Sequence, residues 1–224
     1  SSLTRVATAS SALKNSDAAI RYPLPKDFLS LSVDLYRNQR FLASLANWLG
    51  SPRQRHVLVL FQNPSELRPA GGFLGSFADV TFDADGIRDI AVSDVYDPDG
   101  QLDLTFAAPR QLQLITPTWG ARDANWSFDF PASARKVIEF LQNSKIYRER
   151  AITFDGAVAI NINVLKTILS LTGKIELPEY QLTISEENFL ATIQREVETG
   201  YDNRVRGEPK RILKQLAPLI LSRL

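Results

Sequence analysis

The sequence predicts an α/β fold in which helices sandwich a mixed central sheet, preceded by a helical lead-in. Two observations carry this prediction. From His56 onward, apolar runs with strand character alternate with segments of helical period, which is typical of strands and helices packed in layers. Before His56 the apolar residues follow helical period only. We therefore place the helical lead-in at residues 1–52 and the α/β domain at residues 53–224.

The lead-in contains leucines spaced by four, seven, three and four residues, which is the period of one helix face. These are Leu31, Leu35, Leu42, Leu45 and Leu49. Gly50 followed by Ser51 and Pro52 is a helix stop signal. We expect this helix to pack on the sheet or on a partner.

Several segments of the domain have strand character. A buried strand is predicted over His56–Phe61, and the runs Phe73–Phe82 and Ile87–Val95 flank the turn Asp83–Gly86, which indicates a β-hairpin. Two short apolar strands are expected further along the chain, at Gly156–Ile160 and Lys174–Leu177.

Helices are predicted between and after these strands. Pro109–Ile115 is predicted to be a short helix, and Val164–Leu171 a longer one. Thr183 and Glu186 have the spacing of a capping box, which predicts the start of another helix. The last helix is expected to begin near Glu208.

The composition excludes several classes of protein. The chain has 224 residues and no cysteine, so disulfides, thiolate nucleophiles and cysteine-bound zinc are excluded. The formal net charge is +1 without a long basic run, which disfavours a general nucleic-acid binder. No run of about 18 apolar residues is present, so no segment of this sequence is expected to span a membrane. Because methionine is absent even at position 1, we expect a processed product or a fragment.

The segment Gln62–Ser76 carries three glycines within five positions and one arginine, Arg68. Glycines gather where the backbone takes positive φ or approaches another group closely. Arginine binds phosphate or carboxylate through a planar fork, so Arg68, Gly71 and Gly72 are candidate phosphate ligands. The spacing matches neither the phosphate-binding loop nor the dinucleotide fingerprint. On spacing alone, a tight strand connection is therefore the favoured interpretation.

The segment Ser93–Asp103 contains four aspartates. Asp94 and Asp97 are candidate ligands of Mg²⁺ or Ca²⁺, because carboxylates supply the oxygen ligands that these cations prefer. The competing interpretation is a solvated turn, since Asp-Pro and Asp-Gly are turn dipeptides.

Two further polar segments are candidates for ligand contact. Asn125 lies in a loop with an arginine, an aspartate and a tryptophan, which could face a sugar or cap the core. Arg204 and Arg206 could share a phosphate, although basic residues before a helix are more often solvated. His56 is the only histidine, and without a G-x-S-x-G elbow we interpret it as structural.

Six segments in this order resemble the bacterial domain-of-unknown-function 4012 family: QNPSELRPAGGFLGSF, VSDVYDPDGQL, DANWSFDFPASA, FDGAVAINI, LTGKIELP and PKRILKQLAPLIL. The resemblance covers about Val57 to Leu224. It implies an extracytoplasmic protein of the bacterial cell envelope, with a membrane anchor before this chain and residues 1–50 as the end of a membrane-proximal helical stretch. The partners it implies are an envelope glycan, a polyprenyl lipid or an envelope protein.

A more distant resemblance is to the LytR–CpsA–Psr family of extracytoplasmic α/β transferases. These enzymes move glycopolymers from polyprenyl pyrophosphate to the cell wall with Mg²⁺. The resemblance implies the same fold, with Arg68 and Asn125 at the phosphate and Asp94 or Asp97 at the metal. Arg204 or Arg206 would then stabilise the developing charge.

The sequence departs from that transferase family at its late R-x-R pair, where Gln194 and Glu196 stand here. Pyrophosphate chemistry needs the positive charge that these two residues remove. We therefore expect a non-catalytic module that binds an envelope glycan or protein. The alternative is an Mg²⁺-dependent phosphotransferase, and the sequence does not decide whether the chain is an enzyme.

Overall fold

The structure is a computed structural model that describes residues 26–200, 202, 208 and 210–223. The candidate residues Arg204 and Arg206 lie outside the described residues. The chain divides into two compact units. The first comprises residues 1–53 and 83–86, and the second comprises residues 54–82 and 87–224.

The first unit contains α3 (Lys26–Leu49), the helix predicted from the leucine spacing. The helix ends at Gly50, whose N–H donates to the carbonyl oxygen of Ala46 at 2.8 Å. The side chains of Leu42, Leu45 and Leu49 are exposed. That the helix packs on the domain or on a partner stays a prediction.

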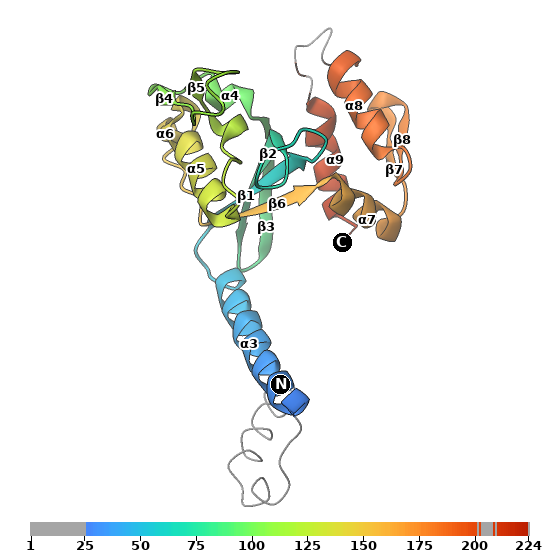
Figure 1. The fold of residues 1–224 in the computed structure, drawn as a ribbon. Helices are drawn as coiled ribbons and strands as arrows, with labels where there is room; N and C mark the ends of the chain where they lie inside the picture. The colour runs from blue at the N-terminus through green and yellow to red at the C-terminus, as the bar shows by residue number, and fades with distance from the viewer. Residues whose placement is uncertain (1–25, 201, 203–207, 209, 224) are drawn as a thin grey trace, which may run out of the picture. The chain divides into compact units, whose positions relative to one another are not determined.

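A mixed four-stranded sheet forms the centre of the second unit (Figure 1). The strand order is β3-β2-β1-β6, with β1 antiparallel to β2 and parallel to β6. The strands are β1 (Arg55–Asn63), β2 (Phe73–Asp83), β3 (Gly86–Asp94) and β6 (Gly156–Asn161). The mixed sheet and its four strands confirm the prediction from the sequence.

Helices and two small antiparallel ladders surround this sheet. The helices are α4 (Tyr96–Asp99), α5 (Phe130–Asn143), α6 (Lys145–Glu149), α7 (Ile162–Thr172), α8 (Phe189–Thr199), α9 (Arg211–Leu221) and the short 3₁₀ helices η1 (Ala121–Asp123) and η2 (Pro178–Tyr180). The ladders are β4 (Phe106–Ala107) with β5 (Thr118–Trp119), and β7 (Ile175–Leu177) with β8 (Leu182–Ile184).

One face of the sheet packs against α5 and forms the first core. Because side chains alternate along a strand, Leu58 and Leu60 of β1 point to the same side and meet Val137 and Phe140 of α5. Phe77 of β2 joins this cluster. Complete burial of each such side chain stabilises the fold by about 1.5–3 kcal/mol.

A second core joins α7, α8 and α9 to the β7–β8 ladder. Leu169 of α7, Ile175 of β7, Ile184 of β8, Phe189 of α8 and Ile212 of α9 are all buried in it. Residues far apart in the sequence thus form a compact group beside the other face of the sheet (Figure 1).

Two predictions about local structure are wrong. Pro109–Ile115 forms successive turns instead of a helix, and because Leu114 and Ile115 are 93% and 84% exposed, the segment has no continuous apolar face to bury. Thr183 lies in β8, because strand pairing with β7 places the next residue, Ile184, in the second core. The helix begins only at Phe189.

Candidate functional site

The glycine loop between β1 and β2 is a tight connection held by its own chain. Gly71 and Gly72 have φ of 110° and 135°, in the region that favours glycine. A Cβ on Gly72 would lie 2.4 Å from the carbonyl oxygen of Asn63. The Nε2 of Gln62 donates to the carbonyl oxygen of Ala70 at 2.7 Å. Positive φ accounts for both glycines without a ligand, together with the close approach of the Gln62 side chain at Gly71 and of the Asn63 backbone at Gly72.

The guanidinium of Arg68 is bound by protein groups. Its Nη2 and Nε donate to Oδ1 of Asp123 at 3.0 and 3.2 Å, and its Nη1 donates to the carbonyl oxygen of Leu67 at 2.9 Å. The same group lies over the ring of Phe73, 5.2 Å from the ring centroid. A phosphate at Arg68 would have to compete with the carboxylate of Asp123.

Asn125 completes this group of contacts. Its side chain is fully buried, and its Nδ2 donates to the carbonyl oxygen of Gly72 at 2.7 Å. The backbone carbonyl of Asn125 accepts from the N–H of Ala70 at 3.3 Å. Its buried Oδ1 has no hydrogen-bond partner among the described residues. The structure thus joins Arg68, Gly72 and Asn125, as contacts that fix the loop.

The two aspartates proposed as metal ligands have different surroundings. Oδ1 of Asp94 lies 2.9 Å from Nζ of Lys210 and accepts from the N–H of Tyr96 at 3.0 Å. Asp97 is exposed in α4. Within the described part of the chain, no three histidine or acidic side chains are grouped so that they could hold a metal ion. The contact with Lys210 competes with a cation at Asp94, and Mg²⁺ binding by Asp94 and Asp97 stays a prediction.

Asp99 is an acidic side chain that the sequence analysis did not single out. Its carboxylate accepts from the N–H groups of Ala121 and Arg122, at 2.6 and 3.3 Å, where η1 begins. Burial raises the pKa of Asp99 above its ordinary value, against the opposing effect of these hydrogen bonds. Asp99 fixes η1 in place, and through Asp123 of η1 it supports the Arg68 contact.

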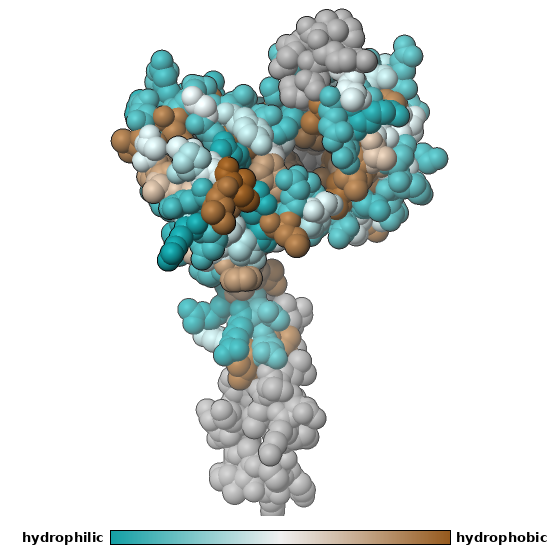
Figure 2. Space-filling view, turned by 45° about the horizontal axis from the view of Figure 1, so that its top comes forward, coloured by the Kyte–Doolittle hydropathy of each residue, from teal (hydrophilic) through white to brown (hydrophobic). Residues whose placement is uncertain are grey.

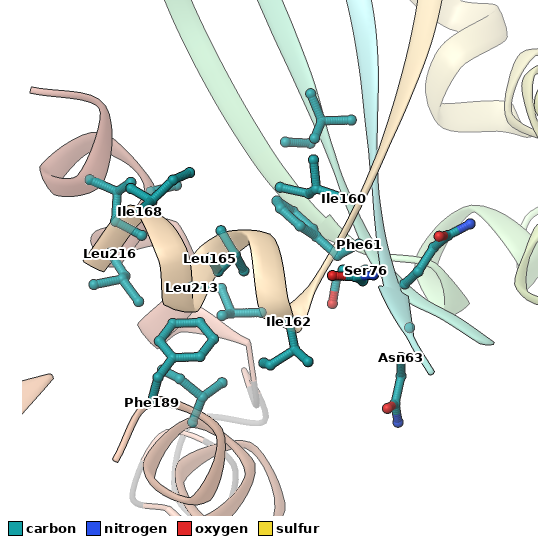
Figure 3. Close-up of a pocket in the computed structure, with 18 of the residues that line it drawn as sticks. Phe61, Asn63, Ser76, Ile160, Ile162, Leu165, Ile168, Phe189, Leu213 and Leu216 are labelled. Atoms are coloured by element: carbon teal, nitrogen blue, oxygen red, sulfur yellow. The ribbon is translucent and has the colours of Figure 1, made fainter. Parts of the chain in front are cut away.

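An apolar pocket of about 500 Å³ lies between the sheet and the helices of the second core (Figure 3). The sheet contributes aliphatic and aromatic side chains, namely Val59, Phe61, Phe73, Ala78, Val80, Ile87, Ile90 and Ile160. The helices contribute Ile162, Leu165, Ile168, Phe189, Leu190, Ile193, Leu213, Leu216, Ala217 and Ile220. In Figure 3 the side chains of α7 and α9 face Phe61 and Ile160 across the pocket. Because Val59, Phe61 and Leu165 are only partly buried, the pocket is accessible from solvent.

Ser76 of β2, next to a β-bulge, places one hydroxyl group in this pocket. The register of β1 and β2 shifts so that Phe61 is opposite Ser76 while Gln62 is opposite Leu74, which leaves Gly75 as the extra residue. Leu74 therefore faces the first core, whereas Ser76, two positions later, lines the pocket beside Phe61 (Figure 3). Ser76 is 6% exposed.

The remaining polar residues of the pocket lie where β1 and β6 end. They are Gln62, Asn63, Glu66 and Asn161. The Oδ1 of Asn161 accepts from the N–H groups of Asn163 and Val164 and so caps α7. Glu66 is the only charged residue among the described residues that line the pocket. The pocket is thus apolar along most of its wall, with a hydroxyl, a few amides and the carboxylate of Glu66 among its lining residues.

Residues 53–197 match the family described as "Protein of unknown function (DUF4012)". The chain belongs to this family. No curated protein matches the chain, and neither does any solved structure. The DUF4012 match includes the glycine loop, the sheet and α7, and it ends before α9, which supplies part of the pocket wall.

Sequence reasoning missed the pocket of this DUF4012 member because its wall residues resemble core residues. Leucine and isoleucine on a helix face predict burial. The sequence does not reveal that the apolar faces of the sheet and of the helices leave a space between them. One signal was present. Leu74 and Phe77 both face the first core but are three residues apart with Gly75 between them, and a glycine that interrupts strand alternation indicates a bulge.

Hydrophobic side chains also reach the surface outside the pocket of this DUF4012 chain (Figure 2). Leu67 and Phe128 are 87% and 89% exposed. Among the helices that the structure describes, none is both long and apolar enough to cross a membrane.

Proposed function

We propose that this chain is a non-catalytic binding protein of the bacterial cell envelope that holds the hydrocarbon chain of a lipid in the apolar pocket. The observation that carries the proposal is the pocket wall, which is aliphatic or aromatic along both the sheet and the helices. The volume of about 500 Å³ falls within the range of roughly 300–1,000 Å³ that is usual for small-molecule sites. An acyl or polyprenyl chain fits such a wall, because it needs apolar contact and few polar partners.

The energetics favour this kind of ligand. Apolar surface removed from water contributes roughly 25 cal/mol per Å², and a flexible hydrocarbon chain can adapt to a pocket lined by branched side chains. Leu165, Leu213 and Phe61 are only partly buried by the protein itself. A bound chain would remove their remaining surface from water.

The alternative function, a phosphotransferase with a LytR–CpsA–Psr-like fold, requires free cationic groups and a metal. The contacts of Arg68 with Asp123, and of Asp94 with Lys210, oppose that alternative. Gln194 and Glu196, where the transferases have arginines, oppose it as well. We therefore favour binding without catalysis.

A titration with Nile red, an uncharged dye that fluoresces in apolar surroundings, tests the proposal. We expect saturable binding to the wild-type chain and loss of binding in Ala217→Trp, which places a large ring in the pocket. Ala191→Trp is the matched control, because Ala191 is exposed on α8 and does not line the pocket. Equal binding by all three proteins, each verified as folded by its unfolding transition, would refute the proposed site.

A further inference from the structure

We infer that the pocket selects an uncharged lipid with a hydroxyl head group over the corresponding phosphate. This inference rests on the lipid-binding function proposed above and specifies the ligand of the same site. Three features of the pocket carry it: the unpartnered hydroxyl of the buried residue Ser76, the absence of a cation among the described lining residues, and the carboxylate of Glu66.

Ser76 provides a polar group that is aimed at a ligand. Its side chain is 6% exposed and lines the pocket, and its hydroxyl makes no hydrogen bond within the described part of the chain. The Oγ of Ser76 is not among the fully buried polar atoms without a partner, so it remains open toward the pocket. A hydroxyl can both donate and accept a hydrogen bond. The pairing of Ser76 with Phe61 places this group beside Phe61, near the end of β1 where the other polar lining residues lie. A ligand hydroxyl would complete the hydrogen bonding there.

The charges of the pocket oppose a phosphate. No lysine, arginine or histidine occurs among the described residues that line it. Its one charged residue in this part of the chain is Glu66, whose Oε1 accepts from Nδ2 of Asn63 at 3.2 Å. Lys210 is close to Gly75, but its ammonium group is bound to Asp94 and to the carbonyl oxygen of Gly75. When a phosphate enters an apolar pocket without a cationic partner, the hydration free energy that it loses exceeds the free energy of its new contacts.

Competition against Nile red tests this preference with three ligands that share one isoprenoid chain: farnesene, farnesol and farnesyl monophosphate. We expect farnesol to bind about tenfold more tightly than the phosphate, a ratio equivalent to about 1.4 kcal/mol. Ser76→Ala should weaken the binding of farnesol about fivefold and leave the affinity for farnesene unchanged, because farnesol has a hydroxyl that can bond to Ser76 and farnesene has none. Glu66→Gln should reduce the difference in affinity between farnesol and farnesyl monophosphate, because it removes the repulsion between the carboxylate and the phosphate.

The outcomes separate this inference from the function on which it rests. Binding of all three ligands with equal affinity, or tighter binding of the phosphate, overturns the head-group preference and leaves a lipid-binding pocket. If Ser76→Ala lowers the affinities for farnesol and farnesene equally, the preference is also overturned, since that loss of affinity would reflect packing alone. Failure of all three ligands to displace the dye overturns the proposed function and the inference together.

Discussion

The guanidinium Nη2 of Arg68 lies 3.0 Å from Oδ1 of Asp123 and joins the glycine loop to η1. Asp123 also contacts Arg122 at 3.3 Å, and Arg122 contacts Asp99 at 3.4 Å. The most conspicuous arginine of the sequence thus belongs to a chain of ion pairs. Its position in the loop is explained by the ion pair that joins the glycine loop to η1.

We predict that Arg68→Ala lowers stability and leaves Nile red binding unchanged. Asp123 is buried, and without Arg68 its Oδ1 loses both guanidinium hydrogen bonds while Oδ2 keeps only Arg122, so we expect a loss of about 1–3 kcal/mol. Urea denaturation measures the loss. Arg110→Ala is the control, because Arg110 is exposed and should change stability by less than about 0.5 kcal/mol. An unchanged stability together with lost ligand affinity would instead indicate that Arg68 binds ligand.

Gly72→Ala should be far more damaging than Gly86→Ala. Both glycines have positive φ, 135° and 119°, so each substitution carries backbone strain of about 1–3 kcal/mol. Only at Gly72 would the new Cβ also collide with the carbonyl oxygen of Asn63, whereas nothing lies within 4 Å at Gly86. Thermal unfolding of the two variants measures the difference. Equal losses would show that strain alone explains the glycine.

Mg²⁺ should not raise the unfolding temperature of the chain. A ligand stabilises a protein only when it binds the folded state, and Asp94 is already neutralised by Lys210. Thermal unfolding with and without Mg²⁺ tests this expectation. A Mg²⁺-dependent increase that disappears in Asp94→Asn or Asp97→Asn would restore the metal site proposed from the sequence.

The pH dependence of stability should contain a contribution from Asp99. Burial raises its pKa above 3.8 in the folded state, so the folded chain binds this proton more tightly than the unfolded chain. The contribution of Asp99 to stability is therefore largest at low pH and is lost as the pH rises from about 3.8 through the raised pKa.

Asp99→Asn removes this contribution. The stability of the variant relative to the wild type should therefore increase between pH 3.8 and neutral pH. Denaturant unfolding of both proteins across that interval measures the relative stability, and the comparison cancels the other carboxylates. Parallel stability curves would show that the folded environment of Asp99 leaves its proton affinity unaltered.

Local sequence patterns predicted the elements that depend on local chemistry. The leucine period predicted α3, and alternation with turn residues predicted the strands on both sides of Asp83–Gly86. Asn161, which caps the start of α7, acts through the neighbouring N–H groups of Asn163 and Val164. The capping-box prediction at Thr183 was wrong because pairing with Glu176 in β7 is a contact that no local pattern contains.

The candidate site was harder to predict, because its contacts join distant segments. Arg68 and Asp123 are separated by 55 positions, so local patterns indicated a candidate phosphate ligand where the fold has an ion pair. Ser76 and Leu213 meet at one pocket although they belong to β2 and α9. Only the interrupted alternation at Gly75 indicated that β2 contains a bulge.

A methyl NMR titration with farnesol tests the central claim, that an apolar chain binds between the sheet and α7–α9. We predict saturable shifts for the methyl groups of Leu165, Leu213 and Leu216, which line the pocket. The methyl groups of Leu58 and Leu141, in the core on the opposite face of the sheet, should remain unchanged. Shifts confined to Leu58 and Leu141, or no saturable shift at any of the five residues, would contradict the account.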